Sequence, residues 1–593
     1  MLFVHFALPA MLASLAATSS LPVQNVPAAN EIIARNKPCA NGPNSRHCWG
    51  DYSLKTNYYE EIPNTGVTRE YWFDVQNTTM APDGYLQNVL TINGSIPGPT
   101  IIADWGDEVV VHVTNNMQHN GTTIHWHGIR QHNNNENDGV PGVTQCPIAP
   151  GQSYTYRWRA EQYGSSWYHS HFSFQYSAGL YGGIIINGPA TADYDEDLGN
   201  LFLSDWGHID PFNQWWWNRP KNGPPSQANS LINGTNVFDC TGSKNPNCLG
   251  NGTRFEVVFD HGKKYRLRLV NPSLYGHYRF AIDGHTLTVI ANDFVPIVPY
   301  KTDNVIISMG QRYDIIVEAN AKPDNYWLRP IWQRSCCDND YWNNTLGIVR
   351  YNKHSTDLPK TTNAAVNYPY TCDDEPFDKL VPYMNLDVPA PAYIPPLNLY
   401  FAFVPMPAGF LFTLNQSYIW VNFSAPTNLL LSQGVHNFPS TPYPNATGGG
   451  FTDYDAFELE GRDKWVYYAM QDISHRNRSH PFHLHGHDYY VLAQGSGNYT
   501  GQPLRLRNPI RRDTATVPMN GYMVMAFKLD NPGSWLFHCH IAAHSSEGLG
   551  LQFVELEDDI TGTFKAQGQL DETCDAWKGY WKDSIYIQED SGI

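Results

Sequence analysis

The segment EVVVHV at residues 108–113 is a short run of β-branched side chains, and segments of the same kind recur along the chain. Others are TII at residues 100–102, YRLRL at 265–269 and MVMAF at 523–527, and several of them alternate in polarity. Clusters of Gly, Pro, Asn and Asp bound these segments, and no long helical periodicity is visible. Short strands at this spacing predict an all-β protein built from β-sandwiches or Greek-key barrels.

The length of 593 residues exceeds what one hydrophobic core usually supports, so about three domains are expected. One boundary lies at Asn187-Gly188-Pro189, which closes an apolar run, and a vaguer one lies near the Pro-rich stretch at 386–396. We place the three domains at residues 21–190, 191–375 and 376–593. No solenoid-type repeat is visible.

The charge balance of 38 Lys+Arg against 56 Asp+Glu gives a formal net charge of −18. Such an acidic surface repels phosphate backbones and anionic lipids, which argues against nucleic-acid and membrane partners. Residues 1–20 form a short apolar run that ends in small residues and is typical of a secretory signal peptide. We therefore expect a secreted, extracellular and monomeric protein.

Many N-x-[S/T] sequons support secretion, because they are acceptors for glycosylation. They include Asn77, Asn93, Asn120, Asn233, Asn251, Asn343, Asn422, Asn445 and Asn498. The chain also has ten cysteines, and most should pair in an oxidising compartment. Cys539 lies between two histidines and is better interpreted as a metal ligand. The other nine predict four disulfides and one free thiol, at Cys336 or Cys337.

Histidine pairs spaced i, i+2 give the chemical signal. They occur in HWH at 125–127, HSH at 169–171, HPFHLH at 480–485 and HCH at 538–540, which His544 follows. Residues i and i+2 of a strand point to the same face, so each pair can present two imidazoles to one side. A single pair is most often a surface or core feature, and a histidine-rich zinc tract is local. Four pairs spread over more than 400 residues instead predict a fold that gathers eight imidazoles around a small metal cluster.

Cys539 is the most informative position. If His538 and His540 face one side of a strand, Cys539 faces the other, so one strand supplies a thiolate to one site and two imidazoles to a second. A His₂Cys set with a weak or absent axial ligand is typical of a blue-copper electron-transfer centre. Cys539, His544 and His480 supply such a set.

These segments in this order resemble the multicopper oxidases, and the match to laccases of filamentous ascomycete fungi is close. The likeness covers most of the mature chain and includes GSIPGPT at 94–100, NDGVPGVTQCP at 137–147 and GSSWYHSH at 164–171. The last residues, DSGI at 590–593, are similar to the C-terminal plug of those enzymes. The resemblance implies three cupredoxin-like domains, with a metal cluster between the first and the third.

The resemblance also implies four copper ions: a type 1 copper that takes electrons from the donor, and one type 2 and two type 3 coppers that reduce dioxygen. The type 1 ligands would be His480, Cys539 and His544. The axial position falls on Leu549, which cannot coordinate, so the reduction potential should be high. The remaining ligands would be His125 and His483 for type 2, and His127, His169, His171, His485, His538 and His540 for type 3. His112, His119, His132 and His487 lie outside this pattern and are expected to be structural or to support the ligands from behind.

Two carboxylates are candidates for proton supply to dioxygen. Asp138 matches the family's acid beside the cluster, and Asp590 in the tail is a second candidate; either could also be an ordinary carboxylate. The resemblance further implies disulfides at Cys39–Cys48 and Cys146–Cys574, and one from Cys336 or Cys337 to Cys372. Cys240–Cys248 would be an additional local loop.

The substrate pocket departs from the family's pattern. Laccases of this group usually place Asp or Glu where this chain has Tyr275, and that acid can accept the phenolic proton as the electron leaves. The stretch Ser177-Ala178-Gly179 also lacks the usual acid or amide. We therefore expect a specialised pocket, suited to one polyphenol of pigment or secondary-metabolite assembly.

The sequence thus predicts a secreted laccase that oxidises phenolic or aromatic-amine donors with dioxygen. A phenol-coupling oxidase of narrow specificity is the first alternative. A metallo-oxidase such as a ferroxidase is less favoured, because the chain lacks a Met-rich region or a membrane anchor. A copper-binding electron carrier would leave the eight paired histidines unexplained.

Overall fold

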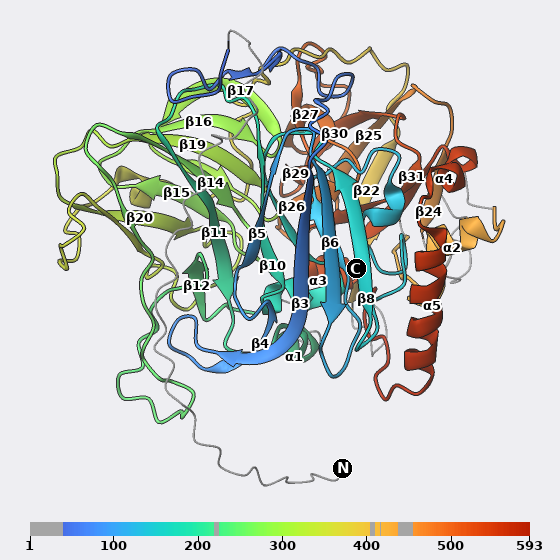
Figure 1. The fold of residues 1–593 in the computed structure, drawn as a ribbon, viewed down its shortest axis with the longest axis horizontal. Coiled ribbons are helices and arrows are strands. Elements are labelled where there is room, and N and C mark those ends of the chain that lie inside the picture. Colours follow the sequence, from blue (N-terminus) through green and yellow to red (C-terminus); the bar gives the residue numbers. More distant parts are fainter. Residues whose placement is uncertain (1–38, 219–224, 404–409, 416, 437–454) are drawn as a thin grey trace.

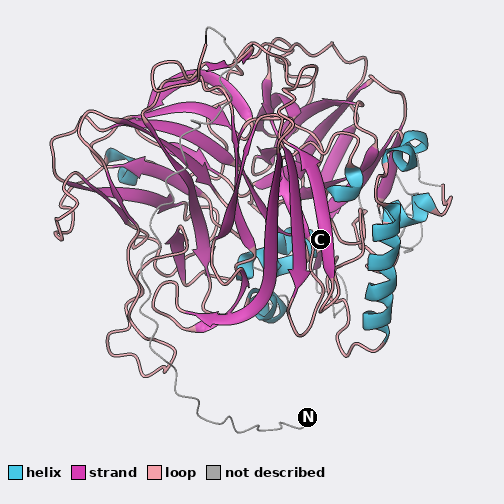
Figure 2. Ribbon diagram, viewed as in Figure 1, coloured by secondary structure: helices cyan, strands magenta, loops and turns pink. Residues whose placement is uncertain are grey.

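The structure is a computed structural model that describes residues 39–593 except 219–224, 404–409, 416 and 437–454. The signal peptide expected at residues 1–20 and the sequon at Asn445 lie outside the described residues. Strands dominate the described chain, as Figure 2 shows, and the all-β prediction is confirmed. Within that part of the chain, no helix is long and apolar enough to span a membrane.

Six sheets form three successive pairs along the sequence (Figure 1). The first pair has the orders β4(Gln87–Ile92)-β3(Thr68–Met80)-β6(Glu108–Asn115)-β8(Ser153–Arg159) and β5(Gly98–Asp104)-β10(Tyr181–Asn187)-β9(Gly164–Ser170)-β7(Ile124–His127). A short hairpin, β1(Cys48–Trp49) with β2(Tyr52–Ser53), precedes it.

The second and third pairs contain eleven strands each. The second has the orders β12(Asn229–Ile232)-β11(Glu196–Trp206)-β14(Lys264–Val270)-β19(Arg312–Glu318)-β16(Leu287–Asn292)-β17(Val295–Thr302) and β13(Glu256–Val258)-β21(Gly347–Arg350)-β20(Asn325–Trp332)-β15(Tyr278–Ile282)-β18(Val305–Ile307). The third has the orders β23(Phe410–Leu414)-β22(Pro396–Phe403)-β25(Trp465–Asp472)-β30(Gly521–Lys528)-β27(Tyr489–Ser496)-β28(Ile510–Arg512) and β24(Ala456–Leu459)-β32(Gly550–Glu555)-β31(Gly533–Cys539)-β26(His480–Leu484)-β29(Thr514–Val517).

The second and third pairs repeat one topology. The strands of each pair can be renumbered from 1 to 11 in chain order, so that β11 and β22 both become strand 1. In both pairs one sheet then has the strand order 2-1-4-9-6-7 and the other has the order 3-11-10-5-8. The first pair follows the same plan with fewer strands, so that β7 corresponds to β26 and β9 to β31. The chain therefore contains a threefold structural repeat that its sequence does not display. The predicted limits of the three domains stay predictions.

Helices are short and connect or cover the sheets. The α-helices are α1(Pro211–Asn218), α2(Thr427–Ser432), α3(Ala542–Ser546), α4(Glu557–Thr563) and α5(Gln567–Lys582), and the 3₁₀ helices include η1(Asn135–Asn137), η2(Ser173–Ala178) and η4(Ala364–Asn367). The disulfide Cys146–Cys574 joins α5 to the N-terminal third of the chain. The C-terminal helix α5 (red) consequently lies beside β8 of the N-terminal sheet in Figure 1, where Gln569 accepts a hydrogen bond from the N–H of Thr155.

Candidate metal centre

The four histidine pairs lie on or directly after corresponding strands of the first and third sheet pairs. His125 is the cross-strand partner of His169 where β7 pairs with β9. His483 is likewise the partner of His538 where β26 pairs with β31. Because the two sheets have the same topology, each contributes two adjacent strands of imidazoles to the same place.

The eight paired histidines meet in one buried cluster. Their potential ligand atoms lie within 4.8 Å of one another in each of three groups. The groups are His127 with His169 and His540, His171 with His485 and His538, and His125 with His127 and His483. The first two groups match the two expected type 3 sets, and the third contains the expected type 2 pair.

The imidazoles are in the right state to bind a cation. Burial, reinforced by neighbouring histidines, lowers the pKa of His127, His169 and His483 well below its usual range, so these rings are neutral. Ring nitrogens of the cluster also lack hydrogen-bond partners, among them Nε2 of His125 and both nitrogens of His171. Unpaired buried polar atoms are costly unless something binds them, so the donor set fits metal ions.

Cys539 belongs to a separate group. Its Sγ lies 3.7 Å from Nδ1 of His480 and 3.7 Å from Nδ1 of His544, and the two Nδ1 atoms are 3.2 Å apart. Cys539 and His480 are fully buried. Burial raises the pKa of the Cys539 thiol well above its usual range, so a bound cation is needed to hold it as a thiolate. The two neighbours of Cys539 in the chain, His538 and His540, belong to the histidine cluster and not to the Cys539 group, as the strand argument predicted.

The loop after Cys539 is fixed by Leu549, the expected axial position. The carbonyl of Leu549 accepts a hydrogen bond from the N–H of Cys539 (3.0 Å), and its own N–H donates to the carbonyl of His544 (2.9 Å). The Leu549 side chain is fully buried. The ring of Phe412 packs 4.1 Å from that of His544. Leu549 therefore holds two of the three candidate ligands through its backbone and offers no side-chain donor atom.

Asp138 lies directly behind the cluster. Its Oδ2 is 2.8 Å from Nδ1 of His485, and its carbonyl oxygen is 2.8 Å from Nδ1 of His125. Gly139 makes this approach possible, because a Cβ there would lie 1.9 Å from the carbonyl oxygen of Ile124. Asp138 thus orients two rings whose Nε2 atoms face the cluster.

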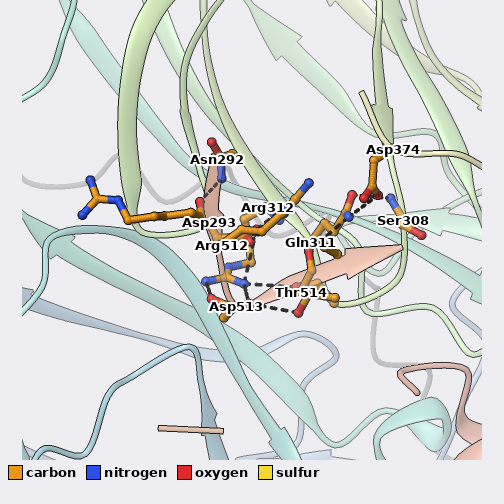
Figure 3. A network of polar contacts seen from close by, with 12 residues as sticks. Asn292, Asp293, Ser308, Gln311, Arg312, Asp374, Arg512, Asp513 and Thr514 are labelled. Atoms are coloured by element: carbon orange, nitrogen blue, oxygen red, sulfur yellow. Dashed lines mark hydrogen bonds and ion pairs between the residues drawn. The ribbon is translucent and has the colours of Figure 1, made fainter. Parts of the chain in front are cut away.

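Asp513 is a second carboxylate behind the cluster, and the sequence analysis missed it. Its Oδ1 is 3.2 Å from Nε2 of His127, and its carbonyl oxygen is 2.8 Å from Nδ1 of His483. Arg312, from the second sheet pair, donates to both carboxylate oxygens at 2.7 and 2.6 Å (Figure 3). Burial raises the pKa of Asp513 to about 6 although Arg312 acts in the opposite direction. All three sheet pairs therefore contribute to the cluster.

The only sequence signal for Asp513 is its context. It follows Arg511 and Arg512 in a run that is otherwise strand-like, and three charged residues in a row are rarely fully buried. Gly128 is required here, since a Cβ would lie 2.4 Å from Oδ2 of Asp513.

Residues 590–593 pack between the first and third sheet pairs. Ser591 and Ile593 are buried, and the N–H of Ser591 donates to the carbonyl of Ser546 at the end of α3 (2.9 Å). Asp590 accepts a hydrogen bond from the hydroxyl of Ser173, which lies two residues after His171. The tail thus lies close to the cluster, as the resemblance implied.

A small pocket opens beside the Cys539 group. Tyr275, His277, Met309, Cys336, Cys337, Arg478, Ser479, Ile541 and His544 line it. The expected substrate-pocket residue Tyr275 is therefore beside a candidate type 1 ligand. Burial raises the pKa of its phenol well above the usual range, so it stays protonated.

The cysteines pair as the sequence analysis expected. The disulfides are Cys39–Cys48, Cys146–Cys574, Cys240–Cys248 and Cys336–Cys372, which leaves Cys337 and Cys539 as thiols. The open choice between Cys336 and Cys337 is settled in favour of Cys336 as the bridged partner. Among the histidines outside the pattern, His487 pairs with Glu555 (3.0 Å) and His112 with Glu70 (2.8 Å).

Comparison with known families decides what kind of protein carries this centre. Three multicopper oxidase family models match, at residues 74–191, 199–354 and 420–559. Together they cover more than half of the chain. The chain belongs to the multicopper oxidases. It is accordingly an oxidoreductase with copper cofactors.

Relatives of this multicopper oxidase cover nearly its whole length. It is 62% identical over 558 residues to an oxidoreductase, OpS5, of Beauveria bassiana, with 94% of this chain and 93% of that protein aligned. It is 49% identical to Laccase-2 of Botryotinia fuckeliana over 100% of this chain and 99% of that one. The crystal structure of a laccase from Botrytis aclada superposes with a TM-score of 0.88 at 49% identity, over 94% of this chain and all of that one. The fold is therefore that of three cupredoxin-like domains, and the oxidase is laccase-like.

Proposed function

We propose that this multicopper oxidase is a laccase. It would take single electrons from phenolic or aromatic-amine donors at a type 1 copper and reduce dioxygen to water at a cluster of three further coppers. The observation that carries the proposal is the position of Cys539, which groups with His480 and His544 while His538 and His540 belong to two other histidine groups. One strand thus serves both an electron-accepting site and a dioxygen-sized cluster.

The residues divide between the four metal positions as follows. His480, Cys539 and His544 would hold the type 1 copper. His125 and His483 would hold type 2, and His127, His169, His171, His485, His538 and His540 would hold the type 3 pair. Copper at these positions supplies one-electron redox chemistry with the donor and with dioxygen. Cys539 is bonded through the backbone to His538 and His540, so the chain provides a continuous covalent path between the two sites.

Two carboxylates would handle the protons. Four phenols that each lose one electron and one proton supply what one dioxygen needs to become two waters. Asp138 contacts Nδ1 of His125 and of His485, so it can orient both rings through the atom that does not face the cluster. Its carboxylate oxygens lie 3.2 Å and 2.8 Å from these two atoms, so the carboxylate can exchange a proton with either ring. Asp590 and Ser173 offer a second hydrogen-bonded position beside His171.

Secretion is part of the proposal. Eight sequons named above place their asparagine at the surface: Asn77, Asn93, Asn251, Asn343, Asn422 and Asn498 are exposed, and Asn120 and Asn233 are partly exposed. Four disulfides, one of them spanning 428 residues, suit an oxidising compartment. We expect an extracellular monomer with domains near residues 21–190, 191–375 and 376–593.

Oxygen uptake by the copper-loaded protein tests the proposal. The donors 2,6-dimethoxyphenol, ferrous iron and ascorbate are compared side by side at equal concentration. Rapid uptake with the phenol alone is the expected result. Uptake only with iron or ascorbate would instead show a metallo-oxidase or an ascorbate oxidase, and a blue protein that consumes no oxygen with any donor would contradict the assignment to simple phenols.

A further inference from the structure

The pocket beside His544 carries a positive charge and no negative one. Arg478 lines it together with Tyr275, His277 and Met309, and none of the nine lining residues is Asp or Glu. Arg478 lies two residues before β26, which begins at His480, and it is half-buried. Arg478 therefore borders the same space from which a donor would reach His544.

The guanidinium has spare hydrogen-bonding capacity. Its Nη1 donates to the carbonyl of Cys336 at 2.6 Å, which fixes its position at the pocket wall. Within the described part of the chain, no carboxylate forms an ion pair with Arg478. A guanidinium has five N–H donors in a planar fork that matches a carboxylate, so most of them stay available.

Asp205, a buried carboxylate behind the Tyr275 loop, is already engaged. Asp205 accepts hydrogen bonds from the backbone N–H groups of Leu274 (2.8 Å), Tyr275 (2.7 Å) and Gly276 (3.1 Å). It thereby holds the loop that presents the Tyr275 side chain. Asp205 is buried and does not line the pocket, so it does not neutralise Arg478 from within it.

We propose that this pocket selects phenols that carry a negative charge, with Arg478 binding a carboxylate of the donor while its phenol ring lies against His544. The proposal rests on the laccase activity proposed above and names the substrate class of the same site. The pocket offers a neutral phenol at Tyr275 and a cation at Arg478. Charge complementarity at a partly desolvated site gives specificity between otherwise similar ligands.

Binding of two matched ligands tests this without any turnover. The probes are 3,5-dimethoxybenzoate and its amide, 3,5-dimethoxybenzamide, which have no phenolic hydroxyl to oxidise. Isothermal titration of the copper-loaded protein should show that the benzoate binds at least about tenfold more tightly, because a hydrogen-bonded ion pair is stronger than a neutral contact. The benzoate should also inhibit oxidation of 2,6-dimethoxyphenol competitively.

Variants of the loop locate the effect. Arg478→Gln should abolish the preference for the benzoate, and Arg478→Lys should retain part of it. Arg476→Gln is the matched control, because it removes the same charge only two residues away in the chain. The Arg476 side chain packs on Phe401 and does not line the pocket. An unchanged blue absorption band in each variant shows that His480 and its neighbours are intact.

Three results would overturn the proposal: equal affinity for the two probes, a preference that survives Arg478→Gln, or inhibition that is not competitive. None of them bears on the laccase activity itself. Failure of that activity would appear separately, as absence of oxygen uptake with any phenol while the benzoate still binds through Arg478.

Discussion

Replacing Asp513 by alanine is the sharpest test of how the cluster is held. Asp513 touches His127 through its side chain and His483 through its backbone carbonyl. The substitution removes the first contact and leaves the second. Loss of such an outer partner typically lowers metal affinity by about 10- to 100-fold. Since only one of two rings loses its partner, we expect the lower end of that range, about tenfold, for copper at the His127 and His483 positions.

The assay measures copper retained after equilibration with graded concentrations of a chelator. Elemental analysis gives total copper, and electron paramagnetic resonance reports the type 2 signal. The blue absorption of the Cys539 site serves as an internal reference, because Asp513 makes no contact with Cys539, His480 or His544 among its hydrogen bonds. Cluster copper should be lost at lower chelator concentration than in the unmodified protein, while the blue band persists.

Asp293→Ala is the control. Asp293 is a buried carboxylate of the same network that binds Arg512 (3.1 Å) but no histidine (Figure 3). Both substitutions remove the carboxylate that accepts a side-chain hydrogen bond from a buried arginine, although Arg312 keeps an ion pair with Asp293 at 3.5 Å in Asp513→Ala. Breaking a buried ion pair typically costs about 3–5 kcal/mol of stability. Only Asp513→Ala should weaken copper binding. Equal copper retention in Asp513→Ala and the unmodified protein would refute the role given to Asp513. Equal copper loss in Asp513→Ala and Asp293→Ala would mean that the loss comes from general destabilisation of the fold.

Three further predictions concern other parts of the molecule. Cys539→Ser should abolish the blue absorption and donor oxidation while copper bound by the eight histidines remains, as spectroscopy and metal analysis would show; a persistent blue band would contradict the type 1 assignment. Tyr275→Asp should raise kcat/KM for simple phenols relative to Tyr275→Asn, because only the acid can accept the phenolic proton, and no difference between the two would remove that idea. Asp455→Asn should flatten the dependence of stability on pH. Burial raises the pKa of Asp455 from the usual 3.8 to about 7, so the folded protein holds this proton more tightly; the resulting stability is present at low pH and is lost as the pH rises toward 7, by roughly 4 kcal/mol in total. Thermal unfolding at pH 4.5 and 8 should therefore show a smaller difference for Asp455→Asn, and an identical difference would mean that the carboxyl is ionised throughout.

The sequence alone predicted the fold class and the set of paired histidines, because both depend on local patterns. Strand segments such as residues 108–113 are recognisable from β-branched side chains, and i, i+2 spacing determines which side chains share a face. Alternation also placed Cys539 opposite its neighbours. Predicting these features requires only that side chains alternate between the two faces of a strand. The structure adds which distant strands supply the partners.

Other features could not be predicted because they depend on contacts between distant segments. The ion pair of Arg312 with Asp513 links residues 201 positions apart, and nothing near either residue indicates its partner. The repeated strand order of the three sheet pairs is a property of connections, since the histidine pairs recur only on the first and third pairs and the other side chains on corresponding strands differ. The choice between Cys336 and Cys337 likewise depends on which thiol points toward Cys372.

The spread of the cluster along the chain has a consequence for how the enzyme is made. His125 emerges early during translation and His540 about four hundred residues later, so at roughly 5–20 residues per second the ribosome needs on the order of 20–80 s to deliver the remaining residues. Until His483 has been made, none of the three histidine groups described above is complete, and the other two are completed only by His538 and His540. Only a chain extended to His544 carries every histidine of the cluster and of the Cys539 group, so an oxidase interrupted earlier lacks part of its candidate metal centre.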